Sequence, residues 1–144
     1  MKTASFFSYF GPGKISISTR PPKTMADLTQ CRRLAPRYDM LKLEWADYVP
    51  AYESRILAKL DARAVWDVLH ARAGQGVEPV ICCYEKSDHH CHRRLVAEWF
   101  KRELGEDVTE LANARPTTQS VLPGTLRESA LAMLAETKLK KLAP

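Results

Sequence analysis

The feature that most constrains the fold of this 144-residue chain is a short, continuously apolar segment at residues 79–84. An apolar run of this length without polar alternation is typical of a strand buried on both faces of a parallel sheet. The segment contains Cys83 and is followed directly by Glu85. After a short polar turn a helix is expected, with Cys91, His92 and Arg93 in its first turn. Reactive side chains are thus expected beyond the carboxyl end of a strand, where open α/β folds bind ligands.

Strand and helix patterns alternate on both sides of this segment. Residues 14–19 alternate with period two, as a strand does, and the following helices show apolar residues at helical spacing. Such alternation predicts an α/β fold, here a small three-layer sandwich with a mostly parallel central sheet. The expected elements are strands at 14–19, 79–84 and 107–111, and helices that begin near the caps Asp47, Asp61 and Ser87 or Asp88, the last of them ending at Gly105.

Four segments are expected along the chain. Residues 1–13 lack an apolar signal region and are interpreted as an N-terminal extension, disordered or at a sheet edge. Residues 14–111 form the α/β domain, and residues 112–124, rich in Pro and Thr, form a linker. Residues 125–144 are predicted to form an appended amphipathic C-terminal helix. This helix either packs back on its own domain or docks a partner, including a second copy of the chain.

Composition limits the classes of protein that fit. The 22 basic and 17 acidic side chains give a net charge of +5, which favours anionic partners. The two signs interleave, however, so a nucleic-acid patch and an ordinary solvated surface remain alternatives. No run of about 18 apolar residues is present, so no membrane span is expected. Four cysteines without a secretory signal favour a reducing, cytoplasmic compartment.

Helix geometry predicts which side chains near the turn share a crevice. At about 100° per residue, His92 falls in the middle of the apolar arc of its helix, with Cys91 and Arg93 at the two edges. All three should therefore face the sheet. If the first strand runs parallel to residues 79–84, Arg20 emerges at the same edge. The residues expected to converge are Arg20, Cys83, Glu85, Cys91, His92 and Arg93.

Anion binding and thiol chemistry are two possible uses of this cluster. Arg20 and Arg93, together with the amides of a helix N-terminus, can bind phosphate or carboxylate, unless Arg93 only pairs with Glu85. Cys91 at a helix N-terminus beside His92 can be a stabilised, nucleophilic thiolate, unless it is a small buried cysteine. The Cys-x-x-Cys spacing is absent, and so is a Cys-x₅-Arg phosphatase loop starting at Cys83.

Metal binding and acid–base catalysis are two further uses. Cys83, Cys91 and the histidines around Cys91 are enough donors for zinc. Adjacent donors lack the spacing of structural zinc sites and no second ligand pair is present, so neither a metal nor a cofactor is expected. Glu85 beyond the strand can act as acid, base or nucleophile, unless it serves only in an ion pair. Cleavage of a glycosidic bond usually requires two carboxyls, and Asp88 is a weak second one.

The two halves of the turn also resemble a known family. A strand with Cys-x-Glu, a short turn, then Cys-His-Arg and an amphipathic helix resembles the signature of the domain of unknown function family 488. Ser18-Thr19-Arg20-Pro21, Leu34-Ala35-Pro36 and Tyr52 resemble its shorter, YeaO-like branch, over about residues 14–111. The Gly-Tyr-Ser start and Asp-Val-Arg strand of the longer members are absent. The resemblance implies a small α/β domain without implying an activity, and its signature positions here are Cys83, Glu85, Cys91, His92 and Arg93.

Two functional hypotheses follow. The preferred one is an enzyme acting on a phosphate-bearing substrate, a nucleotide or nucleic acid, by cleavage or transfer of an N-glycosidic bond. Glu85 is favoured over Cys91 for the chemistry because a near-buried carboxylate is costly unless it is used or paired. The alternative is a non-catalytic binding module, with a structural or zinc-holding Cys-His-Arg turn and a partner-docking C-terminal helix. The candidate catalytic residues are Glu85, Cys91 and His92; the candidate substrate or phosphate contacts are Arg20, Arg93, Cys83 and Tyr84, with Tyr84 or Trp45 as a stacking platform.

Overall fold

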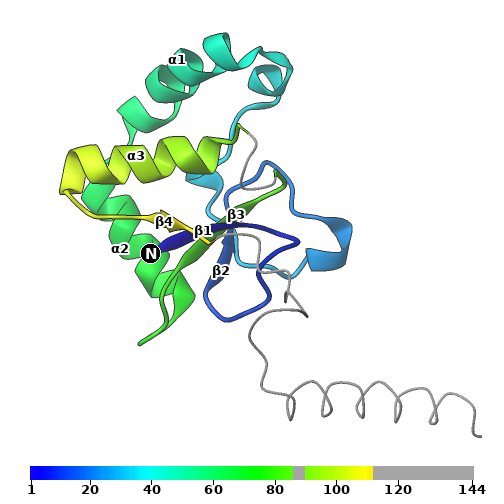
Figure 1. Cartoon of the computed structure of the whole chain (residues 1–144), viewed down its shortest axis with the longest axis vertical. Helices are drawn as coiled ribbons and strands as arrows, with labels where there is room; N and C mark the ends of the chain where they lie inside the picture. Colours follow the sequence, from blue (N-terminus) through cyan, green and yellow to red (C-terminus); the bar gives the residue numbers. More distant parts are fainter. Residues whose placement is uncertain (86–89, 112–144) are drawn as a thin grey trace, which may run out of the picture. The chain divides into compact units, whose positions relative to one another are not determined.

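A four-stranded parallel sheet forms the centre of the domain (Figure 1). The structure, a computed structural model, describes residues 1–85 and 90–111. The strands lie in the order β2-β3-β1-β4, and every pairing between them is parallel. The predicted α/β class with a parallel central sheet is therefore confirmed. The strands are β1 (Lys2–Ser5), β2 (Lys14–Ser16), β3 (Val80–Cys83) and β4 (Thr109–Glu110).

The two inner strands are β3 and β1. All four residues of β3 are buried, as its continuously apolar sequence predicted. The expectation that residues 1–13 form a disordered or edge extension is wrong for β1, which pairs with β3 on one side and β4 on the other. Thr3, Ala4 and Ser5 are buried there. Small and hydroxylated side chains fit a narrow space beside neighbouring strands, but they give no apolar signal in the sequence.

Three α-helices carry most of the remaining core. Asp61 caps α2 as predicted, because its carboxylate accepts a hydrogen bond from the amide of Ala64 at 2.7 Å. Gly105 ends α3 in the left-handed conformation, with φ of 69°, where a glycine costs least. The helices are α1 (Trp45–Arg55), α2 (Ala62–Ala73) and α3 (His92–Leu104); the short 3₁₀ helices are η1 (Lys23–Met25), η2 (Arg32–Leu34), η3 (Tyr38–Lys42) and η4 (Leu57–Lys59).

Two helix starts differ from those expected. Helix α1 begins at Trp45, ahead of the expected cap Asp47, and Glu44 at its N-cap makes no side-chain capping bond. Helix α3 begins at His92 with Cys91 at the N-cap, so neither Ser87 nor Asp88 caps it. A cap is read from sequence by residue type, and neither Glu44 nor Cys91 is a preferred N-cap residue. The shift moves Cys91 from the first helical turn to the junction of turn and helix.

The helices lie against one face of the sheet. Ile15 and Ile81 of the sheet share a buried cluster with Tyr52, Leu69 and Phe100, which come from α1, α2 and α3 respectively. The opposite face presents a smaller cluster, which is covered by side chains from η1 and neighbouring loops. That smaller cluster contains Ala4, Phe6, Val80 and Cys82, with Tyr9, Met25, Leu28 and Leu111 packed against it. Within the described residues the outer layer on that side is thus made of loops and a 3₁₀ turn.

The predicted linker at 112–124 and the predicted helix at 125–144 lie outside the described residues. No helix in the described part of the chain is long and apolar enough to span a membrane. Strands β2 and β4 are shorter than the expected 14–19 and 107–111. The chain after β2 nevertheless continues along β3, because the amide of Ile17 donates to the carbonyl of Cys82 at 3.0 Å. This extension carries residues 18–20 to the same edge as the end of β3.

Candidate functional site

A cavity of about 430 Å³ lies at the carboxyl ends of β2 and β3. Three segments form its polar wall: residues 18–20 after β2, residues 83–85 at the end of β3, and residues 90–92 at the start of α3. Residues from η3 and α1 supply the apolar wall. The cavity as a whole is lined by four aromatic side chains, namely Tyr38, Trp45, Tyr48 and Tyr84. The site therefore occurs where parallel strands end and a helix begins, as the sequence predicted.

The fold brings most of the predicted residues to this cavity. Arg20, Cys83, Tyr84, Glu85, Cys91 and His92 all line it. The Arg20 guanidinium lies over the ring of Tyr38, 5.6 Å from its centroid, in a cation–π contact. Arg93 is not among the residues that line the cavity and is fully buried.

Arg93 is a structural residue. Its side chain is fully buried, and its Nε and Nη2 donate to both carboxylate oxygens of Glu110 at 2.7–3.1 Å. Its Nη1 donates to the main-chain carbonyl of Glu85 at 2.7 Å and to Cys83 Sγ at 3.0 Å. A guanidinium with this set of partners has no free face for a substrate phosphate, which corrects its assignment as a phosphate contact. The predicted ion pair between Arg93 and Glu85 is not formed, because Arg93 bonds only the main-chain carbonyl of Glu85. The carboxylate that pairs with Arg93 belongs to Glu110 on β4.

His92 is held in one orientation and one tautomer. Its Nε2 lies 2.8 Å from the carbonyl oxygen of Ile17, which can only accept, so Nε2 carries the proton. The Nδ1 lone pair then faces Cys91, whose sulfur lies 3.7 Å away. Burial is the main cause that lowers the pKa of His92 to about 4; the bond to Ile17 opposes this shift and the nearby charge of Arg93 adds to it. The ring is therefore neutral at pH 7.

The buried, neutral His92 predicts a pH dependence of stability. Unfolded, its pKa returns to about 6.5, so between pH 6.5 and about 4 the unfolded state binds more protons than the folded state. The stabilisation is complete above pH 6.5 and is lost as the pH falls through this window, by on the order of 3 kcal/mol. Urea unfolding of metal-free protein at several pH values should show this slope, and His92→Asn should lack it. An equal slope in both proteins would contradict this assignment.

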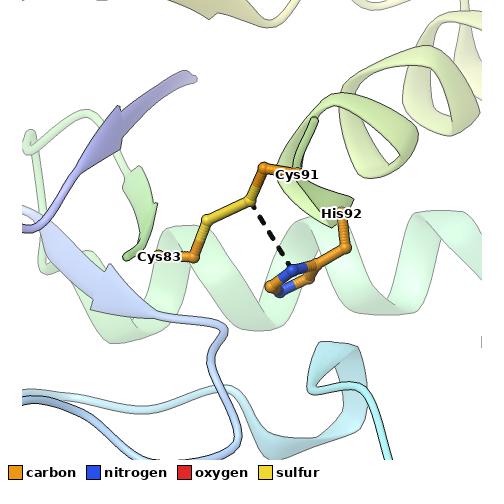
Figure 2. Close-up of side chains that lie close together, drawn as sticks. All are labelled: Cys83, Cys91 and His92. Carbon is orange, nitrogen blue, oxygen red and sulfur yellow. Dashed lines mark hydrogen bonds between the residues drawn. A yellow bond between two sulfur atoms is a disulfide. The ribbon is translucent and has the colours of Figure 1, made fainter. Parts of the chain in front are cut away.

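Cys83 and Cys91 form a disulfide between the end of β3 and the start of α3 (Figure 2). The sequence favoured reduced thiols and did not anticipate this pairing, because the spacing of these two cysteines is not that of a recognisable disulfide motif. Their Cα atoms are 7.7 Å apart. The remaining cysteines, Cys31 and Cys82, are buried and free. Burial raises the pKa of Cys31 and raises that of Cys82 to about 12, so both are poor nucleophiles.

Glu85 lies on the cavity wall with its side chain exposed. Its Oε2 is 3.3 Å from Cys83 Sγ, and its main chain is anchored by Arg93. The expectation of a near-buried carboxylate is therefore wrong. Burial of Glu85 gives no reason to prefer it to Cys91 as the catalytic residue. Its position at the end of β3 remains as predicted. Tyr84 beside it is also exposed and packs edge-on against Phe6, with centroids 5.1 Å apart.

The main feature that the sequence interpretation missed is a stack of aromatic rings along α1. Trp45 stacks on Tyr48 at 5.5 Å and 12°, and Tyr48 stacks on Tyr52 at 5.8 Å and 9°. His90 also stacks on Trp45, at 4.7 Å and 24°. The spacing of three and four residues between the α1 rings places them on one helix face, a signal present in the sequence. Burial raises the pKa of Tyr48, and the Tyr52 hydroxyl donates to the Leu34 carbonyl at 2.6 Å.

Comparison with known proteins decides the family. Residues 22–100 match the family described as Domain of unknown function DUF488. The chain belongs to this family. No curated protein and no solved structure matches it. The matched part of this DUF488 chain contains β3, the turn and most of α3, and therefore every cavity residue except those at 18–20.

Proposed function

We propose that this DUF488 protein is an enzyme that binds a nucleotide, free or within a nucleic acid, in the cavity and cleaves or transfers its N-glycosidic bond. The observation that carries the proposal is the joint presence, in one cavity, of stacked aromatic rings and a carboxylate beyond the end of a parallel strand. The volume of about 430 Å³ lies within the range of about 300–1,000 Å³ that small-molecule sites occupy.

The aromatic wall supports recognition of a flat ring. The rings of Trp45 and Tyr48 are nearly parallel, and Tyr48 in turn stacks on Tyr52, so they need little ordering when a further ring stacks on Trp45. Stacking of a base on an aromatic side chain contributes about 1–3 kcal/mol and tolerates any base, because every base has a π face. This platform therefore fits a nucleobase without requiring a particular one.

Arg20 supports recognition of the phosphate. It is exposed, lines the cavity and is oriented by Tyr38, whereas Arg93 is committed to Glu110. The hydroxyl-bearing residues Ser18 and Thr19 line the same wall and add possible donors. Among the described residues that line the cavity Arg20 is the one arginine, which predicts a modest electrostatic contribution, larger for a phosphorylated ligand than for a nucleoside.

Glu85 supplies the chemistry in this proposal. As a general base it accepts a proton from a water whose oxygen attacks the anomeric carbon. The bond between that carbon and the base nitrogen breaks, its electron pair remains on the base, and Glu85 returns the proton to the base. In a transfer reaction a hydroxyl group takes the place of the water. Most enzymes that cleave glycosides need a second carboxyl to protonate an alkoxide, but a heteroaromatic base is a better leaving group.

One observation favours the alternative of a non-catalytic binding module. The disulfide between Cys83 and Cys91, together with the bonds of Arg93 to Cys83 and Glu85, supports a structural role for the Cys-His-Arg segment. In that alternative, nucleotides would bind without being converted. Product analysis after incubation with bound ligand separates the two.

Binding is tested by calorimetry and thermal-shift screening with nucleosides, nucleotides and short single-stranded DNA or RNA. Trp45→Ala should weaken binding by about 5- to 150-fold, the equivalent of one lost stacking contact. Arg20→Ala should weaken binding of phosphorylated ligands, lower its salt dependence and leave nucleosides unaffected. Arg63→Ala, an exposed change on α2, is the control. Binding of nucleotides that ignores both salt and Arg20 would contradict the phosphate assignment.

A further inference from the structure

We propose that Cys83, Cys91 and His92, once the two cysteines are reduced, bind one zinc ion that keeps an open coordination position toward the cavity. This inference goes beyond the proposed function and does not depend on which substrate the cavity takes. It concerns three buried side chains from two elements, the end of β3 and the start of α3 (Figure 2).

The three donor atoms are already gathered. The sulfurs of Cys83 and Cys91 and a ring nitrogen of His92 all lie within 4.8 Å of one another. Cys91 Sγ and His92 Nδ1 are 3.7 Å apart. Two ligands on a tetrahedral zinc, with Zn–S of about 2.3 Å and Zn–N of about 2.0–2.1 Å, lie about 3.6 Å apart. That edge of a zinc site is therefore present in the fold.

The backbone leaves room for an ion between the cysteines. Their Cα atoms are 7.7 Å apart. Disulfides usually join Cα atoms about 4.4–6.8 Å apart. Two thiolates on one zinc lie about 3.8 Å from each other, as the tetrahedral geometry requires. The wider separation suits two sulfurs that share a metal ion.

Two of the three proposed ligands are hydrogen-bonded to neighbouring groups, as the ligands of metal sites usually are. The Nε2–H of His92 is fixed by the Ile17 carbonyl, which leaves Nδ1 free to coordinate. Arg93 donates to Cys83 Sγ at 3.0 Å, and Glu110 in turn fixes Arg93. A cationic donor favours the thiolate form that zinc requires. These contacts come from three parts of the chain and converge on the same two ligands.

The fourth coordination position points to the chemistry of the site. Three protein ligands and one exchangeable position characterise catalytic zinc, and all three residues line the cavity. Glu85 Oε2 lies 3.3 Å from Cys83 Sγ, so a water on the metal would lie close to this carboxylate. Zinc deaminases use the same spacing, with a glutamate two residues after a ligand acting as acid and base without binding the metal. The adjacent donors argued against zinc in the sequence, but the fold places the Cys83 sulfur within 4.8 Å of the donor atoms of Cys91 and His92.

The test is a Co²⁺ titration of the full, untagged chain, reduced and kept free of oxygen. One Co²⁺ per chain should bind, with a thiolate-to-cobalt charge-transfer band and tetrahedral visible bands, and Zn²⁺ should displace it. Cys83→Ser and Cys91→Ser should each weaken binding by at least about tenfold, because even the loss of an outer partner of a metal ligand typically costs about 10–100-fold. Cys31→Ala, a change at a free buried cysteine, should bind like the unmodified chain.

A second measurement on the unmodified chain keeps the test valid if a serine variant fails to fold. Zn²⁺ should protect Cys83 and Cys91 of reduced protein from an alkylating reagent, as followed by mass spectrometry. The proposal is overturned if reduced protein binds no Co²⁺, or if Zn²⁺ leaves the alkylation of both cysteines unchanged. Neither readout needs a substrate, so failure here leaves the proposed function standing, and failure of nucleotide binding leaves the metal site standing.

Discussion

Arg93→Met should lower the free energy of unfolding by about 3–5 kcal/mol, the usual cost of removing one partner of a buried ion pair. The guanidinium is fully buried and bonds the carboxylate of Glu110, a main-chain carbonyl and a sulfur. Methionine fills much of the volume but leaves Glu110 without its cation and the Glu85 carbonyl without a donor. Because the Glu110 side chain is 23% exposed, water can partly solvate it, and the lower end of the range is expected.

Urea unfolding followed by circular dichroism measures this change. Arg63→Met, at an exposed position on α2, serves as the matched control and should stay within about 0.5 kcal/mol of the original protein. Glu110→Gln should cost less, since the amide oxygen still accepts from Arg93. A loss below about 1 kcal/mol for Arg93→Met would mean that the buried network does not hold β3, α3 and β4 together.

Glu85→Gln should reduce turnover by at least about 100-fold, in line with the 10²–10⁴-fold contribution of a positioned acid or base. Glutamine keeps the shape and the polar contacts of the side chain but cannot accept a proton. Because Glu85 is exposed, the same change should alter stability by no more than about 0.5 kcal/mol. Ligand affinity should change little, so the effect falls on kcat.

Glu98→Gln, an exposed change on α3, is the control for Glu85→Gln and should leave turnover unaffected. The measurement is release of free base from any nucleotide that the binding screen identifies, quantified by chromatography. If the Glu85 variant retains full turnover, the carboxylate is not the acid–base group. If the unmodified chain binds nucleotides without converting them, the non-catalytic alternative is correct.

The elements that the sequence predicted are those whose signals are local. An apolar run identifies β3, the carboxylate of Asp61 caps α2, and Gly105 ends α3. Each signal depends on a few adjacent residues and on the intrinsic preferences of their side chains. The position of the cavity followed too, because parallel strands end at one edge, and the family was recognised from the residues around the turn.

The features that the sequence did not predict depend on contacts between distant segments. Strand β1 has almost no apolar signal, so its place inside the sheet depends on pairing with β3 and β4. The partner of Arg93 is Glu110, which lies on another strand, and no local spacing distinguishes it from Glu85. The pairing of Cys83 with Cys91 joins the end of β3 to the start of α3, and no local spacing predicts it. In each case the sequence offers several possible partners of the same chemical type, and the fold decides which of them makes the contact.

The most direct test of the central claim is a crystal structure of the Glu85→Gln variant soaked with nucleoside monophosphates. The base should stack on Trp45 at the cavity at the ends of β2 and β3, with the phosphate beside Arg20 and the anomeric carbon within reach of residue 85. A nucleotide bound on another surface, or a cavity that stays empty while calorimetry also detects no binding at millimolar concentration, would contradict the account.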